Sequence, residues 1–181
     1  MSLLARQQMV RNRLSLDPAA PDELACVAAL AECIWWRCYP PIIGSAQVHY
    51  MLGRCYALRA LREAQQTGTR FSLLRIAGMP IGFSAWRHDA QAAFLNKLYL
   101  HPGFHGTGLG RWLIDASCRQ MAGEGVDQVR LRVNCYNHPA IRAYKRAGFV
   151  FSGSDCQPIG RGFVMDDYLM SRTGILGLLL D

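Results

Sequence analysis

The sequence predicts an α/β (α+β) protein built on a mixed, mostly antiparallel sheet of about six or seven strands with helices on both faces. Apolar residues recur at helical spacing through residues 22–66, whereas short apolar runs separated by glycine and proline turns follow from residue 70. The 181 residues are 51% hydrophobic and 18% charged, a composition that suits one domain with one sizeable core.

The first part of the chain is predicted to be helical. Residues 24–35 place their apolar side chains on one helical face, after Asp22 as a possible N-cap, and Pro40 ends this helix. Further helices are expected over residues 47–52 and 56–63. An antiparallel meander is then expected, with strands over residues 71–76, 81–87 and 92–100. A helix over residues 109–121, a strand over 128–133, a helix over 137–146 and strands over 149–152 and 162–170 complete the expected sheet.

The loop from His101 to Arg111 contains four glycines and leads directly into a helix. Glycine permits positive φ and a close approach of backbone to ligand, while the first helical turn presents unpaired N–H groups and the positive end of the dipole. The loop is therefore predicted to bind an anion, phosphate above all, the alternative being a connector without a ligand. It is not a P-loop, because Arg111 stands where a P-loop carries lysine. The strict alternation of Gly106, Gly108 and Gly110 also excludes the dinucleotide fingerprint.

Two motifs in order resemble the signatures of the GCN5-related N-acetyltransferase (GNAT) superfamily. The acyl-CoA loop of the family, Arg/Gln-x-x-Gly-x-Gly/Ala, is matched by His105 to Gly110, with histidine in the first place. The second signature, Asn-x-x-Ala-x-x-x-Tyr followed by Gly-Phe, is matched by Asn137, Ala140, Tyr144, Gly148 and Phe149. The resemblance covers roughly residues 69–172, and the chain is similar to uncharacterised bacterial members.

This resemblance implies a GNAT fold and an acyltransferase of class EC 2.3.1, which moves an acetyl group from acetyl-CoA to a primary amine by direct attack in a ternary complex. In the family, the pantetheine arm of the cofactor pairs with the strand before the loop, where a backbone N–H polarises the thioester carbonyl. The cofactor-binding residues so implied are Leu98, Tyr99, Leu100, His105, Gly106, Thr107, Gly108, Leu109, Gly110, Arg111, Asn137, Ala140 and Tyr144.

The resemblance also assigns a catalytic acid and leaves the base open. Tyr144 matches the family tyrosine that protonates the leaving thiolate, and Asn137 matches an asparagine that binds the cofactor arm or caps the following helix. Many relatives use a glutamate on the strand before the loop as base, but the best-matched place holds Asn96, which cannot accept the proton. A chain of waters is one alternative. The other candidates are Asp166, Asp167, His49, His88, His101 and His138.

In the family, the early helices line the groove for the acceptor. Aromatic and histidine side chains of this region are therefore candidates for the pocket wall, with plain core as the alternative. They are Trp35, Trp36, Tyr39, His49, Tyr50 and Tyr56.

The charge and composition of the chain limit which partners it is expected to bind. The 20 basic residues exceed the 13 acidic ones, for a net charge of +7, which suits an anionic cofactor such as acetyl-CoA. The arginines are scattered rather than clustered with aromatics, so nucleic acid is disfavoured as a partner. No apolar run is long enough to span a membrane and no signal peptide is recognisable, so a cytoplasmic location is expected. The identity of the amine acceptor stays open.

No metal is expected. The seven cysteines are an odd count without a C-x-x-C pair, which indicates neither a disulfide framework nor a zinc site. His101 and His105 have the spacing of a zinc-binding helix, but Pro102 and Gly103 lie between them and disfavour that helix.

Two alternative functions remain open, and both ends of the chain carry predictions of their own. A non-catalytic acyl-CoA sensor or docking module is the main alternative, supported by Asn96, and an acetyltransferase toxin acting on charged tRNA is the other. Residues 1–12 are expected to form a flexible segment and residues 13–172 one acetyltransferase domain. Residues 173–181 are an apolar tail that adds a strand, covers a groove or joins a second copy into a homodimer.

Overall fold

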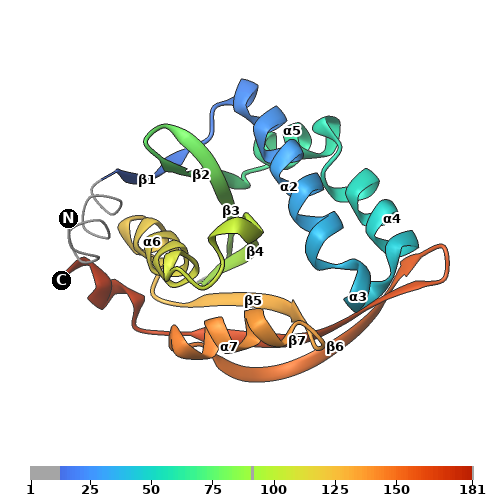
Figure 1. Ribbon diagram of the computed structural model, residues 1–181. Coiled ribbons are helices and arrows are strands. Elements are labelled where there is room, and N and C mark those ends of the chain that lie inside the picture. Colours follow the sequence, from blue (N-terminus) through green and yellow to red (C-terminus); the bar gives the residue numbers. More distant parts are fainter. Residues whose placement is uncertain (1–12, 91, 181) are drawn as a thin grey trace.

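The computed structural model describes residues 13–90 and 92–180, in which seven strands form one sheet of order β1-β2-β3-β4-β5-β7-β6 (Figure 1). The strands β4 and β5 run parallel, and the other five neighbouring pairs are antiparallel. The predicted mixed, mostly antiparallel sheet is thus confirmed. The strands are β1 (Leu14–Pro18), β2 (Arg70–Ile76), β3 (Met79–Asp89), β4 (Ala92–Leu100), β5 (Val129–Asn134), β6 (Val150–Gly160) and β7 (Phe163–Arg172).

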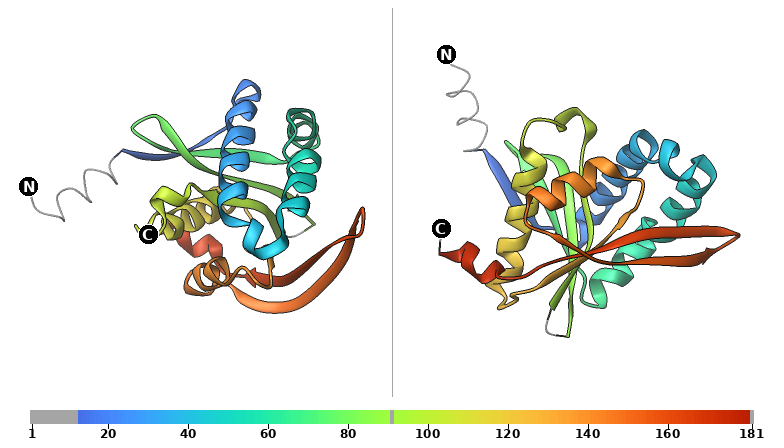
Figure 2. Two further views of the ribbon diagram at one scale, coloured as in Figure 1. Left: turned by 45° about the vertical axis from the view of Figure 1, so that its right-hand side comes forward. Right: turned by 90° about the horizontal axis from the view of Figure 1, so that it is seen from below.

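Helices cover both faces of this sheet, as expected (Figures 1 and 2). One face carries α2 (Leu24–Cys38), α3 (Pro40–Ile43), α4 (Ser45–Cys55) and α5 (Leu58–Gln66). The other carries α6 (Leu109–Gly123) and α7 (His138–Arg146). Short 3₁₀ turns lie at Pro21–Glu23, Pro102–Phe104 and Ile175–Leu179.

The alternation along β2 explains why both faces are covered. Phe71 and Leu73 are buried in the cluster that includes α2, whereas Leu74 is buried with residues of α6. Successive side chains of a strand point to opposite faces, so a strand that is apolar on both sides needs a helical layer on each. Ser72 lies on the α6 side, where its hydroxyl donates to Oε1 of Gln120 at 3.0 Å.

The parallel pair β4–β5 separates partway along its length. Their ladder runs only from Ala93 opposite Val129 to Leu95 opposite Leu131, although β4 continues to Leu100. The separation begins at a bulge: Lys97 pairs with Ala85 and Leu95 with Trp86, so Asn96 has no partner on β3. A bulge bends its strand and increases the local twist. The bend moves the second half of β4 away from β5 and opens the sheet there.

The hairpin of β6 and β7 is longer than the sequence predicts. A strand was expected over residues 149–152, whereas β6 extends to Gly160 and its hairpin reaches α4 (Figure 2). There the Tyr50 hydroxyl donates to the Ile159 carbonyl at 2.6 Å, and Nε2 of Gln47 donates to the Val164 carbonyl at 2.8 Å. Buried and exposed residues do not alternate regularly along β6, so its sequence lacks the two-residue hydrophobic period that predicts a strand.

The structure differs from the sequence predictions in one strand and at two helix ends. The strand β1 was not expected, because its five residues are too few for a clear period. Asp22 does not cap a helix: it lies inside a 3₁₀ turn that Glu23 closes by accepting from the Ala20 N–H at 2.9 Å. Pro40 does more than end α2, because it occupies the first turn of α3, where its missing N–H costs nothing.

The apolar tail forms a 3₁₀ turn and adds no strand to the sheet. Ile175 is fully buried beside α6, and its N–H donates to the carbonyl of Asp127 at 3.3 Å. The side chain of Asp127 accepts from the N–H of Leu176 at 3.2 Å. The tail therefore covers core, and its role in a homodimer stays a prediction.

Residues 1–12, expected to be flexible, lie outside the described residues. Along the described chain, every helix is too short or too polar to cross a membrane.

Candidate active site

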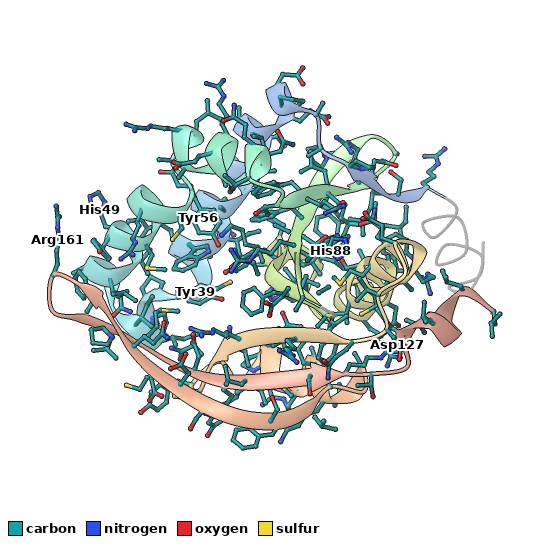
Figure 3. All side chains as sticks on the ribbon, turned by 180° about the vertical axis from the view of Figure 1, so that it is seen from behind. Tyr39, His49, Tyr56, His88, Asp127 and Arg161 are labelled. Atoms are coloured by element: carbon teal, nitrogen blue, oxygen red, sulfur yellow. The ribbon has the colours of Figure 1, made fainter. Side chains whose placement is uncertain are left out.

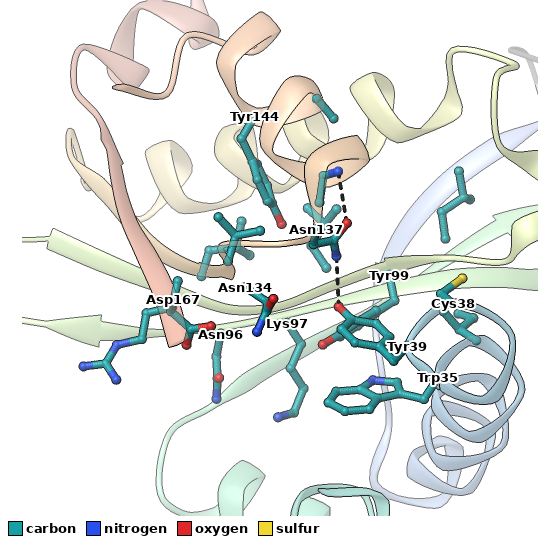
Figure 4. A pocket seen from close by; sticks show the side chains of 18 of the residues that line it. Trp35, Cys38, Tyr39, Asn96, Lys97, Tyr99, Asn134, Asn137, Tyr144 and Asp167 are labelled. Carbon is teal, nitrogen blue, oxygen red and sulfur yellow. Dashed lines mark hydrogen bonds between the residues drawn. The ribbon is translucent and has the colours of Figure 1, made fainter. Parts of the chain in front are cut away.

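A pocket of about 980 Å³ lies where β4 and β5 separate (Figure 4). It connects the helices α2 and α4 on one face of the sheet with the glycine loop and α7 on the other. Nine of the predicted cofactor-binding residues line it: Leu98, Tyr99, Leu100, His105, Gly106, Gly110, Asn137, Ala140 and Tyr144.

The glycine loop has the geometry of an anion cradle. Gly106 and Gly108 have φ of 77° and 86°, in the left-handed region that favours glycine, and Gly108 is the N-cap of α6. A Cβ placed on either residue would meet no atom within 4 Å, so the space in front of the loop is open. Within the described chain no group accepts a hydrogen bond from the N–H of Gly106, Thr107 or Gly108. These donors and the positive end of α6 fit a phosphate.

Four residues predicted to bind the cofactor do not line the pocket. The Thr107 hydroxyl donates to the Phe104 carbonyl at 2.6 Å and holds the turn. Leu109 is buried in the core between β4 and α6. Arg111 pairs with Asp115 at 2.5 Å and lies beside α7, where its guanidinium also donates to a backbone carbonyl. Gly108 also lies outside the pocket lining, and its part is to turn the backbone and cap α6.

The two histidines of the loop bind backbone groups rather than each other. Nδ1 of His101 accepts from the Gly103 N–H at 3.2 Å. Nε2 of His105 lies 3.0 Å from the Leu100 carbonyl, a distance at which it donates a hydrogen bond. His105 thereby ties the loop to the end of β4. Across residues 13–90 and 92–180, no group of three or more potential metal-binding side chains converges on a point.

The edge of β4 that faces β5 is free of strand pairing beyond Leu95. Backbone N–H and C=O groups on such an edge bind extended chains that carry amides. Leu98 and Leu100 on this stretch pack against the α6 side of the core, as their apolar character predicts.

Tyr144 projects from α7 into the pocket, with its hydroxyl directed toward the opening between the strands (Figure 4). Its ring packs edge-on against Phe149 with centroids 5.6 Å apart. Burial raises the pKa of Tyr144, so its hydroxyl stays protonated and remains a potential proton donor. The side chain is 8% exposed.

Asn137 links the two walls of the pocket. Its Oδ1 accepts from the Ala140 N–H at 3.3 Å and caps α7, while its Nδ2 donates to the Tyr39 hydroxyl at 3.4 Å. The capping expected for Asn137 is confirmed.

The wall formed by the early helices is aromatic. Trp35 stacks on Tyr39 with ring centroids 4.4 Å apart, and the Tyr99 ring of β4 lies 6.3 Å from Tyr39 and 6.2 Å from Tyr56. Burial raises the pKa of Tyr39 to about 12 and that of Tyr56 further, so both remain neutral. Figure 3 shows Tyr39 and Tyr56 directed toward the sheet.

The other three wall candidates lie elsewhere. Trp36 is 41% exposed and His49 lies on the outer side of α4 (Figure 3). Tyr50 holds the β6–β7 hairpin. Of the six candidates, Trp35, Tyr39 and Tyr56 line the pocket.

Of the six candidate bases, Asp167 alone lines the pocket. It lies on β7 opposite Asn134 of β5, is 5% exposed, and its Oδ1 has no hydrogen-bond partner among the described residues. Burial raises the pKa of Asp167 to about 6, against the opposing effect of Arg132. A carboxylate with this pKa is ionised at neutral pH and retains the basicity to accept a proton.

Lys97 is a pocket residue that the sequence analysis missed. It follows the bulge on β4, is half-buried, and holds its Nζ 4.7 Å from the centroid of the Tyr56 ring. Burial lowers the pKa of the Lys97 ammonium. A charged residue within a mostly apolar strand is the signal that identifies it in the sequence, once that strand is known to border the site.

The model of the acetyltransferase (GNAT) family matches residues 30–149 of the chain. An uncharacterised N-acetyltransferase of Mycobacterium tuberculosis is 32% identical over 152 residues, which are 83% of this chain and 96% of that protein. Among solved structures, the paiA N-acetyltransferase of Thermoplasma acidophilum in complex with coenzyme A has a TM-score of 0.76 and 21% identity, over 88% of this chain and 98% of that one. A spermidine N-acetyltransferase SpeG chimera from Vibrio cholerae has a TM-score of 0.70 and 18% identity, over 93% and 99%. At such identities the two structures establish the fold.

Proposed function

Because the chain belongs to the acetyltransferase (GNAT) family, and is an N-acetyltransferase that uses acetyl-CoA, we propose that a primary amine attacks the bound thioester directly in this pocket. One observation carries the proposal. The same pocket joins the glycine loop and Tyr144 to the buried carboxylate of Asp167, so the groups needed for both substrates meet in one space.

The residues of the α6 side suit acetyl-CoA, which supplies the thioester. The N–H groups of Gly106 and Gly108 and the N-terminus of α6 would hold its pyrophosphate. The free edge of β4 from Asn96 to Leu100 would pair with the amides of its pantetheine arm. This edge also offers the N–H that polarises the carbonyl when the amine attacks.

Two side chains carry out the proton transfers of the reaction. Asp167 accepts a proton from the acceptor ammonium, which frees the nitrogen lone pair for attack on the carbonyl carbon. Tyr144 donates its proton to the sulfur as the carbon–sulfur bond breaks. Asn96, although it lines the pocket, carries an amide that has no basic site at neutral pH.

The aromatic wall completes the acceptor side. Trp35, Tyr39, Tyr56 and Tyr99 bury the body of an acceptor beside Asp167 and exclude water from the attacking amine. A cytoplasmic location, a homodimer and the absence of a nucleic-acid partner stay predictions.

The proposal is tested by calorimetric titration of acetyl-CoA into wild type and Gly108→Arg, followed by detection of free thiol released in the presence of a panel of primary amines. We expect micromolar binding that Gly108→Arg abolishes, and thiol release that depends on both the amine and Tyr144. Absence of acetyl-CoA binding to the folded wild-type protein would overturn the proposal. Binding without thiol release for any amine would instead favour the sensor alternative.

A further inference from the structure

Lys97 projects toward the acceptor side of the pocket rather than the cofactor side. It alternates with Tyr99 along β4, and Tyr99 belongs to the cluster that packs against α2. The Nζ of Lys97 lies over Tyr56, which follows α4. The glycine loop and α6 lie on the opposite face of the sheet, so the Lys97 cation is separated from the phosphates that this loop would bind.

Lys97 is a partly buried cation without a carboxylate partner among the described residues. Among the other charged residues of the lining, Arg132 pairs with Asp155 at 2.7 Å and Asp89 lies 3.9 Å from Arg130. Arg87 also lines the pocket, but it is exposed, with its guanidinium carbon 5.9 Å from the centroid of the Phe94 ring. A desolvated ammonium over a phenol ring retains strong attraction for an anion, because the ring offers only a weak countercharge.

Asp167 is a buried carboxylate in the same pocket that likewise has no ion-pair partner in the described part of the chain. Its Oδ1 is buried and has no hydrogen-bond partner within the described chain, and Asp167 forms no ion pair with Lys97. Lys97 and Asp167 are thus a partly buried cation and a buried carboxylate that line one pocket without forming an ion pair with each other (Figure 4). A ligand with a cationic and an anionic group satisfies both, whereas a polyamine leaves Lys97 unpaired and is repelled by it.

We infer that the acceptor is an amine that also carries a carboxylate, with Lys97 binding the carboxylate and Asp167 receiving the amine. This inference rests on the proposed function, because it places the acceptor in the pocket that binds acetyl-CoA. It assigns Lys97 as a specificity residue that discriminates zwitterionic acceptors from diamines and polyamines.

The experiment compares the twenty amino acids with their carboxamides, and lysine with its decarboxylated counterpart cadaverine. Affinity is measured by calorimetry on the CoA-loaded protein, and acetyl transfer by thiol release. For the acceptor that binds best, the carboxylate should improve affinity and kcat/KM about 10- to 100-fold over the carboxamide, the range of a charge-assisted hydrogen bond. Lys97→Met should remove this preference and Lys97→Glu should reverse it in favour of cadaverine.

The second lysine of the chain provides the matched control. Lys145 is exposed on α7 and outside the pocket lining, so Lys145→Met should keep the wild-type preference. An unchanged KM for acetyl-CoA shows that each variant is folded. Equal affinity for carboxylates and carboxamides, a preference that survives Lys97→Met, or no binding of any amino acid would each overturn the inference.

The two proposals fail in different ways. Acetyl transfer to amines without regard to a carboxylate would refute the inference about Lys97 and leave the acetyltransferase proposal intact. Conversely, carboxylate binding that depends on Lys97, without any acetyl transfer, would remove the proposed function and leave Lys97 only as the carboxylate site of a binding module.

Discussion

Replacing Asp167 by asparagine should stabilise the protein and inactivate it. Burial raises the pKa of Asp167 from its ordinary value of 3.8 to about 6. The folded state therefore binds a proton more tightly than the unfolded state. The contribution of this group to stability is fully present below about pH 4 and is lost as pH rises to about 6.

The size of the effect follows from the two pKa values. A difference of about 2 units corresponds to a cost of at most about 3 kcal/mol at pH 8, and to about half of that at pH 5, where the folded carboxyl is still protonated. Asp167→Asn removes the ionisable group and with it this cost. Its free energy of unfolding should exceed that of the wild type by about 1–3 kcal/mol at pH 8, and by less at pH 5.

The assay is urea denaturation of both proteins at pH 5 and pH 8, combined with kcat/KM across the same range. As the base, Asp167 should give the wild type an activity that rises through about pH 6. In Asp167→Asn, this rise of activity with pH should disappear and kcat/KM should fall by about 10²-fold or more, while acetyl-CoA still binds. Asp166→Asn is the control, because that neighbouring carboxylate lies outside the pocket lining and should keep its activity. A variant that is less stable at pH 8, or as active as the wild type, would refute the reasoning.

The remaining predictions concern the acid, the cradle and the tail. Tyr144→Phe should lower kcat by about 10²-fold and leave the calorimetric affinity for acetyl-CoA unchanged; an unchanged kcat would exclude its role as acid. Gly108→Arg should abolish cofactor binding, whereas Gly125→Arg, at a similar φ of 81° in an open turn, should bind normally; equal losses would point to unfolding instead. Ile175→Ala should cost about 2–4 kcal/mol in urea denaturation because Ile175 is fully buried, whereas Leu180→Ala, at an 89% exposed position, should cost little.

The cofactor side of the site was predictable from the sequence because its determinants are local. Glycines at fixed spacing before an apolar helical period specify a positive-φ loop and a helix N-terminus without knowledge of the rest of the fold. The same holds for Asn137, whose cap and helix lie within three residues of each other. Arg111 shows the limit of this reasoning, because its side chain pairs with Asp115 one helical turn later and does not line the pocket.

The bulge and the base were not predictable in the same way. Nothing in the residues around Asn96 distinguishes a bulge from a regular strand, because the register depends on how β3 aligns with β4. Asp167 was one of six candidates of similar chemistry. The pairing of β7 with β5 buries Asp167 opposite Asn134 in the pocket. The four histidine candidates lie on other segments of the chain and outside the pocket lining.

The acceptor side depends on contacts between distant parts of the chain, which explains why the family is recognisable and the acceptor is not. The hairpin that carries Asp167 is held against α4 by bonds such as Tyr50 to Ile159, across 109 positions of sequence. The Tyr39 hydroxyl meets Asn137 across 98 positions. Such contacts impose no spacing rule on the sequence, so side chains on this wall can change without disturbing the cofactor loop. A change at a single position such as Lys97 would then alter the acceptor while the fold and the cofactor site stay the same.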